Sequence, residues 1–171
     1  MIDRGYVQVY TGDGKGKTTA AVGLSIRALG AGLKVAFLQF FKDGTSSEVK
    51  ILKTFDNLYY QQFGGKGFVS EVTSELKEII QKGWEEAKRL VFSKEYNIIV
   101  LDEFTFALNW GLVEEKEILQ VLRDKPEEVE IVITGRDAPR SLIEFAHLVT
   151  EMKKIKHYYD QGIRDRIGIE R

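Results

Sequence analysis

The feature that most constrains the fold is a glycine-rich segment at residues 11–19, which reads Thr-Gly-Asp-Gly-Lys-Gly-Lys-Thr-Thr. It follows an alternating apolar run at residues 6–10 and precedes a helix-forming run at residues 20–28. A phosphate-binding loop requires this position between a strand and a helix. Its glycines allow a tight turn whose N–H groups point inward, and the helix start adds partial positive charge at the same place. The segment therefore predicts a loop that binds the phosphates of a nucleoside triphosphate.

Two side chains at the start of the expected helix strengthen this interpretation. Lys17 can reach the terminal phosphates, and the hydroxyl of Thr18 is placed to ligate a divalent cation. The loop departs from the common pattern G-x-x-x-x-G-K-[ST] only at its first position, where Thr11 replaces glycine. A glycine-rich turn without a ligand, which is the alternative, would need neither the lysine nor the threonine. The residues expected at the triphosphate are Gly12, Asp13, Gly14, Lys15, Gly16, Lys17, Thr18 and Thr19.

Composition limits the classes of protein to consider. A chain of 171 residues with 43% hydrophobic and 30% charged residues suits one globular α/β domain over residues 1–171. Its 25 basic and 26 acidic residues nearly cancel, so no global field favours nucleic acid or a membrane surface. The absence of cysteine excludes disulfides, thiolate metal sites and a cysteine nucleophile. No apolar run approaches the ~18 residues of a membrane span, and the first strand leaves no room for a signal peptide, so a cytoplasmic location is expected.

Apolar runs alternate with helical patterns along the rest of the chain. The runs at 35–41, 97–101 and 130–134 are nearly continuous, as in strands that are buried on both faces of a parallel sheet. Helical spacing of apolar residues occupies 20–29, 71–92, 114–123 and 140–145. This alternation predicts a mostly parallel central sheet that helices cover on both faces. Ligands of such sheets bind beyond the carboxyl ends of the strands, so the residues that follow each run should converge on one site.

Two carboxylates, Asp102 and Glu103, follow one of these apolar runs. Acids often end strands at a protein surface without any function. Beside a phosphate loop, however, an acid in this position serves the metal ion that the loop threonine also ligates. We therefore expect Asp102, Glu103 and Thr18 to serve Mg²⁺ or Mn²⁺, and spacing does not decide which carboxylate is the direct ligand.

Two arginines are candidate nucleotide contacts. Arg136 follows the run at 130–134 and either faces the phosphates or the adenosine, or is an inert loop residue. Arg27 lies in the first helix, where it either extends outward or turns toward the nucleotide.

Histidines and aromatic residues supply weaker candidates. His147 stands among apolar neighbours and is expected in the core, whereas His157 has the better claim on chemistry. The default for Phe104, Phe106 and Trp110 is the core, and an apolar ligand pocket is the alternative. The sequence shows no pattern of a Ser/His/Asp triad or of clustered histidine metal ligands.

Beyond a magnesium–triphosphate site, the chain resembles the P-loop type corrinoid (cobalamin) adenosyltransferases, which transfer adenosyl from ATP to cob(I)alamin. The resemblance covers nearly the whole length, and its combination of loop and tail makes it specific. The matching segments are residues 10–21, in which the family also has threonine for the first glycine, Gln39-Phe40-Phe41-Lys42, Leu101-Asp102-Glu103, Ile133-Thr134-Gly135-Arg136, and tail residues 149–152, 156–157, 160–162 and 168–170.

The resemblance implies a RecA-like P-loop fold, a homodimer, ATP as co-substrate, a corrinoid substrate, and release of triphosphate; a flavoprotein is the candidate reductant. It implies that Thr18 and Glu103 serve the metal and that Arg27 lies near the nucleoside. It also places Phe68 at the lower face of the corrin, although Ser70 stands where the family commonly has a tryptophan.

Two rival functions keep the same phosphate loop. One is a P-loop ATP hydrolase or small-molecule kinase, in which Glu103 orients a water or a hydroxyl onto the γ-phosphate. The other is a nucleotide-gated interaction module that binds ATP without consuming it. The released product separates them, because only adenosyl transfer yields triphosphate.

Overall fold

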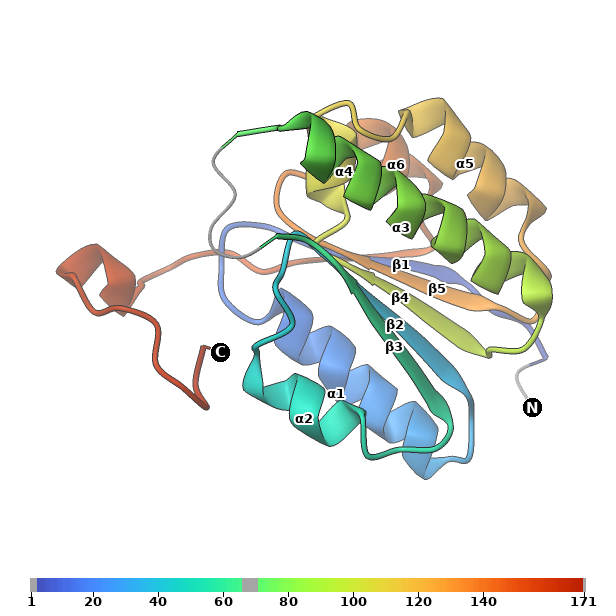
Figure 1. Cartoon of the computed structure of the whole chain (residues 1–171), viewed down its shortest axis with the longest axis horizontal. Coiled ribbons are helices and arrows are strands. Elements are labelled where there is room, and N and C mark those ends of the chain that lie inside the picture. The colour runs from blue at the N-terminus through green and yellow to red at the C-terminus, as the bar shows by residue number, and fades with distance from the viewer. Residues whose placement is uncertain (1–2, 66–70, 171) are drawn as a thin grey trace.

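The computed structural model describes residues 3–65 and 71–170 and contains a six-stranded sheet with helices on both faces (Figure 1). The strand order is β3-β2-β4-β5-β1-β6, and every neighbouring pair is parallel. The predicted α/β sheet is therefore confirmed, and it is parallel throughout. The strands are β1 (Val7–Thr11), β2 (Val35–Phe40), β3 (Leu58–Phe63), β4 (Ile98–Asp102), β5 (Glu130–Thr134) and β6 (Leu148–Glu151).

The α-helices of the described residues form a layer on each side of the sheet (Figure 1). No helix among the described residues combines the length and apolar character needed to cross a bilayer. The first layer contains α1 (Lys17–Gly30) and α2 (Ser47–Leu52). The second contains α3 (Ser74–Ser93), α4 (Thr105–Asn109), α5 (Glu115–Asp124) and α6 (Arg140–Phe145), and a tail with the short 3₁₀ helix η1 (Tyr158–Gln161) follows β6.

The central strands form where the sequence predicts them because both of their faces are covered. Every residue of β2, β4 and β5 is buried. Helix α3 begins later than its apolar pattern, because the Thr73 hydroxyl accepts a hydrogen bond from the Leu76 amide at 3.1 Å and caps the first turn. Val72, which the pattern places on the buried stripe, lies before this cap and is 46% exposed.

Among the strands and α-helices of the described residues, periodicity does not predict β3, β6, α2 and α4. Strand β3 is the edge strand beside β2 and is mostly half-buried, and all four residues of the opposite edge strand β6 are exposed. Edge strands bury less surface, so their sequences lack the continuous apolar run of central strands. The two helices have only six and five residues, which is too short for a helical period to stand out.

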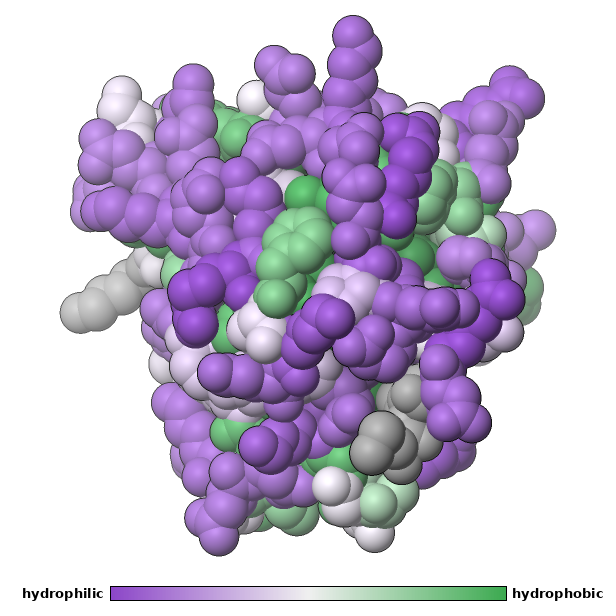
Figure 2. Space-filling view, turned by 90° about the vertical axis from the view of Figure 1, so that its right-hand side faces the viewer, coloured by the Kyte–Doolittle hydropathy of each residue, from purple (hydrophilic) through white to green (hydrophobic). Residues whose placement is uncertain are grey.

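The larger of the two core clusters joins the sheet to the helix layer that contains α3. The ring of Phe104 is fully buried and packs against Phe40 and Trp84, with ring centroids 4.9 and 5.3 Å away. The predicted core position of Phe104 is therefore confirmed. The carboxyl ends of all six strands open on the side of the molecule where the tail lies (Figure 1). The opposite end is covered mainly by hydrophilic side chains, with apolar ones in small separate groups (Figure 2).

Two helical glycines give opposite predictions for the same substitution. A Cβ on Gly83 in α3 would lie 2.5 Å from the Phe63 ring and 2.8 Å from the Phe40 ring, whereas one on Gly23 in α1 would meet nothing within 4 Å. We expect Gly83→Ala to lower the free energy of unfolding by about 1–3 kcal/mol through overpacking. Gly23→Ala should raise it by about 0.5–1 kcal/mol, because alanine loses less entropy in a helix. Urea denaturation measures both, and a stabilised Gly83→Ala variant would contradict the close packing of α3 on the sheet.

Candidate nucleotide site

The glycine-rich loop joins β1 to α1, as the sequence predicts. Gly12 and Gly16 have φ angles of 98° and 122°, which side chains with a Cβ rarely adopt. Gly14 is needed for space, because a Cβ there would lie 2.5 Å from the carbonyl oxygen of Met152. The Gly14 amide donates a hydrogen bond to that same oxygen at 2.5 Å. The loop is therefore shaped by its own glycines and by the tail that follows β6.

Lys17 is buried in the centre of this loop, with 7% of its surface exposed. Its Nζ donates hydrogen bonds to the carbonyl oxygens of Gly12 at 2.7 Å and Gly14 at 2.9 Å. Burial lowers the pKa of Lys17, and the nearby Arg136 guanidinium lowers it further, although attraction to Glu103 opposes both effects. Phosphate oxygens carry charge and bind an ammonium more strongly than carbonyls do, so this side chain suits a polyphosphate ligand.

The carboxylate of Asp102, at the carboxyl end of β4, is completely buried. Its Oδ1 accepts hydrogen bonds from the hydroxyls of Thr134 at 2.7 Å and Thr18 at 2.9 Å. Its Oδ2 accepts from Lys42 Nζ at 2.9 Å and Gln39 Nε2 at 3.2 Å. The hydrogen bond from the loop threonine to Asp102 is thus part of a four-donor network. That network ties α1 to the ends of three neighbouring strands.

Lys42 is a charged site residue to which the sequence pattern assigned no role. Its Nζ contacts Asp102 and also donates to Thr18 Oγ1 at 3.0 Å, while its side chain is 24% exposed. Burial lowers the pKa of Lys42, but attraction to Asp102 and Glu103 outweighs it, so the net pKa is raised. A lysine two residues after a buried strand, at the sheet edge that also carries the acids, was the available signal.

Glu103 follows Asp102 directly and lies in the same cleft with a strained backbone. Its φ is 60°, and its amide donates to the Thr134 hydroxyl at 2.9 Å. Burial raises the pKa of the Glu103 carboxyl, and repulsion from Asp102 raises it further, against the attraction of Lys42 and Lys17. This carboxyl therefore gains from a cation in the cleft.

Left-handed backbone recurs at this edge of the sheet. Phe41 after β2, Glu103 after β4 and Asp137 after β5 all have φ angles between 50° and 60°. Each such residue costs roughly 1–3 kcal/mol, and this strain is typically found at functional sites. The left-handed residues turn the chain sharply after three strands. As a result, Lys42, Glu103 and the loop around Arg136 face one common space.

That space is a cleft of about 490 Å³. Arg136 and His157 line it, and the tail closes one side, where Lys15 Nζ donates to the Ile169 carbonyl at 2.8 Å. Most of the residues predicted to bind the nucleotide therefore line this cleft. Gly12 and Asp102 lie just behind the lining, where Gly12 accepts a hydrogen bond from Lys17 and Asp102 accepts one from Thr18. Its lining comprises residues 13–19, Val22, Lys42, Ser47, Glu48, Glu103, Arg136, His157 and 168–170.

Other predicted residues lie elsewhere. Arg27 is exposed on α1 and does not line the cleft. Phe68 falls outside the described residues. The core position expected for His147 is wrong: His147 is exposed beside β6, because that strand is an uncovered edge, and its Nδ1 accepts a hydrogen bond from the Val7 amide at 3.1 Å. His157 is half-buried, and its Nδ1 accepts from the Tyr159 amide at 3.1 Å.

A partly exposed aromatic group stands at the same end of the sheet. Phe41, Phe106 and Trp110 have ring centroids 5.4 to 6.0 Å apart. Phe106 is half-buried and Trp110 is 38% exposed, so the core expectation is wrong for Trp110. Because Phe41 precedes Lys42 and Phe106 lies in the first turn of α4, three residues after Glu103, these rings form an apolar surface next to the polar cleft.

The donor set fits a hard divalent cation. Among residues 3–65 and 71–170, no group of three or more histidine, cysteine, aspartate or glutamate side chains could hold a metal ion by itself. Mg²⁺ does not require such a group in nucleotide sites, because phosphates and water supply most of its ligands beside one or two carboxylates. Thr18, Asp102 and Glu103 offer oxygen donors of the kind that Mg²⁺ prefers.

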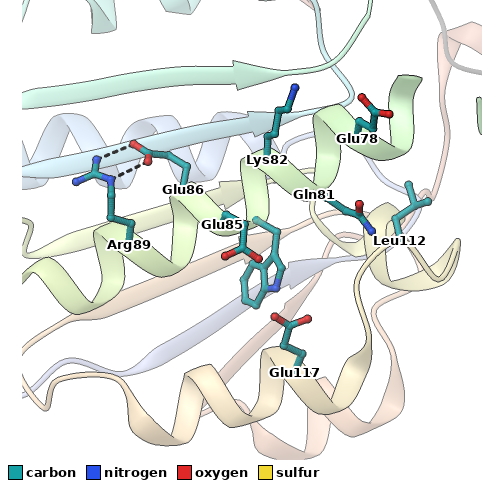
Figure 3. A pocket seen from close by; sticks show the side chains of 9 residues that line it. Glu78, Gln81, Lys82, Glu85, Glu86, Arg89, Leu112 and Glu117 are labelled. Carbon is teal, nitrogen blue, oxygen red and sulfur yellow. Dashed lines mark hydrogen bonds and ion pairs between the residues drawn. The ribbon is translucent and has the colours of Figure 1, made fainter. Parts of the chain in front are cut away.

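A second hollow, of about 650 Å³, lies between α3 and α5 (Figure 3). Four of the six charged side chains that line it have ion-pair partners, either in the hollow itself or on the adjacent Lys88. Arg89 bonds Glu86 at 2.7 Å, and Lys88 bridges Glu85 and Glu117 at 2.7 Å each. The cleft at the glycine-rich loop is therefore the better candidate for a charged ligand.

Comparisons with known proteins agree with this site. A solved structure, the flagellar accessory protein FlaH from Methanocaldococcus jannaschii, has a TM-score of 0.58 and 12% identity, covering 88% of this chain and 72% of that one. This likeness shows the fold alone, and the fold is RecA-like with a P-loop. A corrinoid adenosyltransferase of Escherichia coli K12 is 32% identical over 170 residues, which is 98% of this chain and 86% of that protein.

A corrinoid adenosyltransferase of Sinorhizobium sp. is 35% identical over 173 residues, covering 98% of this chain and 81% of that protein. Residues 3–171 also match the family described as ATP:corrinoid adenosyltransferase BtuR/CobO/CobP, which confirms the resemblance found in the sequence. The chain belongs to the family of ATP:corrinoid adenosyltransferases.

Proposed function

We propose that this protein transfers the 5′-deoxyadenosyl group of ATP to a reduced corrinoid and releases triphosphate. One observation carries the proposal: a chain of this family lines one cleft with a buried Lys17 and with Thr18, which is hydrogen-bonded to the buried Asp102. The cradle suits a polyphosphate, and the family supplies the transferred group and its acceptor. In this reaction the triphosphate is the leaving group, so the site must stabilise charge that develops on it.

The chemistry explains why the cleft needs no obvious general base. The cobalt(I) centre of the substrate is itself a strong nucleophile and brings its own electron pair to the ribose 5′ carbon. The new bond joins cobalt to that carbon, and the bond from the carbon to the triphosphate oxygen breaks with its electrons on oxygen. Lys17 and the loop N–H groups would face the oxygens on which that negative charge grows, and such preorganised donors lower barriers strongly. Holding the two reactants together adds an entropic gain.

The metal would be held by Thr18 and Glu103, with Asp102 behind the threonine. When bound there, Mg²⁺ would offset charge on the triphosphate. Glu103 suits this role because a nearby cation relieves the repulsion that it experiences from Asp102. Asp102 accepts four hydrogen bonds already, which favours an indirect role for it.

The corrinoid would approach over the aromatic surface of Phe41, Phe106 and Trp110. The rings of this surface are partly exposed and adjoin the charged cleft, which suits a large flat substrate whose metal must meet the nucleotide. The resemblance adds Phe68 at the lower corrin face and Arg27 near the nucleoside. It also adds a homodimer and a flavoprotein reductant, and these features stand as part of the proposal.

The first prediction concerns the loop lysine. We expect Lys17→Ala to lower the adenosylation rate about 10²–10³-fold, because a donor to the developing charge is lost. The assay is anaerobic incubation with ATP, Mg²⁺ and chemically reduced cobalamin, followed by the spectral change to adenosylcobalamin and identification of the released phosphate. Urea denaturation verifies that the variant still folds.

Lys34→Ala, which removes a lysine far from the loop in sequence, is the matched control and should keep full activity. Triphosphate is the expected product of the unaltered protein. Release of ADP instead would assign the cleft to a kinase or hydrolase, and a fully active Lys17→Ala variant would remove the loop from the reaction.

The second prediction concerns Glu103. Its raised pKa means that ionisation is disfavoured in the folded state, so its contribution to stability falls as pH rises from about its unfolded pKa, 4.5, through its folded pKa. We therefore expect Glu103→Gln to be more stable than the unaltered protein at pH 7.5 without metal. The difference should disappear below pH 4.5, where both side chains are neutral. Urea denaturation in EDTA at both pH values measures it.

The same variant should need a higher Mg²⁺ concentration for half-maximal adenosylation, because a metal ligand has been removed. Glu71→Gln changes an exposed carboxylate outside the cleft and serves as the control in both measurements. An unchanged Mg²⁺ requirement would transfer the direct ligand role to Asp102.

A further inference from the structure

Lys42 lies where a cation would contact two expected metal-site oxygens together. Its Nζ is 3.0 Å from Thr18 Oγ1 and 2.9 Å from Asp102 Oδ2. The Thr18 hydroxyl donates its own hydrogen to Asp102 Oδ1, so it meets Lys42 with a lone pair. An ammonium in this position and a metal ion on Thr18 Oγ1 compete for the same lone pair and the same space beside Asp102, whether the metal meets Asp102 directly or through water.

The Lys42 ammonium balances the charge of the buried Asp102 carboxylate. Asp102 has no exposed surface, and its other three donors are the neutral groups of Thr18, Gln39 and Thr134. Neutral donors solvate a carboxylate but do not cancel its charge, and an uncompensated buried charge is strongly destabilising. Lys42 therefore supplies the positive charge that neutralises this carboxylate, through an ion pair at hydrogen-bond distance.

The side chain of Lys42 is also free to move away from Asp102 into the cleft. Its side chain is 24% exposed and belongs to the lining of the cleft, whereas Asp102 is enclosed. The residue before it, Phe41, has the left-handed backbone that turns the chain at the end of β2. A lysine side chain is flexible and carries its charge as a point, so it can exchange one anionic partner for another without a change in the backbone.

We propose that Lys42 is a displaceable counter-ion, which neutralises Asp102 until a divalent cation arrives and then moves onto the triphosphate. The proposal rests on the proposed magnesium–triphosphate site and deepens it. Metal and triphosphate bring one new cation and several new anionic oxygens into the cleft. The cation replaces Lys42 beside Asp102, and the phosphate oxygens offer the released ammonium a partner a short distance away. Lys42 is thus a positioning residue for the metal and a direct contact of the leaving group.

The test measures binding without any corrinoid. Lys42→Met removes the charge and keeps the length, and Lys50→Met makes the same change at an exposed position of α2. Mn²⁺ alone is titrated and free Mn²⁺ is read by electron paramagnetic resonance. We expect Lys42→Met to bind Mn²⁺ about tenfold more tightly than the unaltered protein, since its competitor is gone, which corresponds to ~1.4 kcal/mol. Unchanged or weaker Mn²⁺ binding would overturn the proposal.

A second titration uses inorganic triphosphate at saturating Mn²⁺, followed by calorimetry. Here Lys42→Met should bind about fivefold more weakly, because a phosphate contact has been lost. A lysine with a purely structural role would not tighten metal binding and weaken triphosphate binding at once. Unchanged triphosphate affinity would overturn the second half of the proposal.

Thermal unfolding in EDTA tests the counter-ion role and shows whether the variants fold. We expect Lys42→Met to lower Tm by roughly 5–15 °C. Adding Mn²⁺ should raise the Tm of this variant by more than it raises the Tm of the unaltered protein. Adding Asp102→Asn to Lys42→Met should recover most of the loss, because the buried charge is then absent. A double variant as unstable as the single one would overturn the counter-ion role. Failure of adenosyl transfer with all these results intact would count against the proposed function alone.

Discussion

The site depends on one buried carboxylate, that of Asp102. Strand register places it, because β4 lies between β2 and β5, with Gln39 paired to Asp102 and Leu101 paired to Ile133. The strand neighbours therefore bring an amide and a hydroxyl to the acid, and α1 brings a second hydroxyl. A carboxylate is tolerated in a water-excluded place only when its oxygens are bonded and its charge is balanced. Meeting this requirement fixes the positions of the first helix and of the residues after β2.

The glycine-rich loop depends on a different and more distant support. Strand β6 pairs with β1 so that Thr11 aligns with Glu151, which places Met152 against the loop. The Met152 carbonyl receives the Gly14 amide and fills the space that a side chain at Gly12 or Gly14 would occupy. Further on, the tail returns to Lys15 and lines the cleft at residues 168–170. Segments from the two ends of the chain thus line one cleft, in agreement with a match to the family that includes both the loop and the tail.

Sequence alone predicted the parts of this arrangement that follow from strong local rules. The loop 11–19, the buried strands and the acids after β4 each have a pattern that only one local structure satisfies well. The edge strand β6 has no such pattern, because its four residues are exposed and its place comes from pairing with β1. The same reason explains the wrong expectation for His147, whose apolar neighbours belong to an uncovered edge. Lys42 escaped notice because its importance comes from Thr18 and Asp102, which are 24 and 60 residues away and meet it only in the folded sheet.

The internal partners at this site are weaker than those a ligand would bring. Lys17 bonds neutral carbonyls, Lys42 holds a carboxylate that a metal would also serve, and Glu103 is repelled by its neighbour. If triphosphate bound without a metal, Lys42 would still be paired with Asp102 and could not contact it. If a metal bound without triphosphate, the displaced Lys42 ammonium would have no anionic partner. Each ligand thus removes a cost that the other would otherwise meet, which is the thermodynamic condition for positive coupling. The two should therefore stabilise the fold together by more than the sum of their separate effects, and this cooperativity follows from one lysine that is shared between two anionic partners.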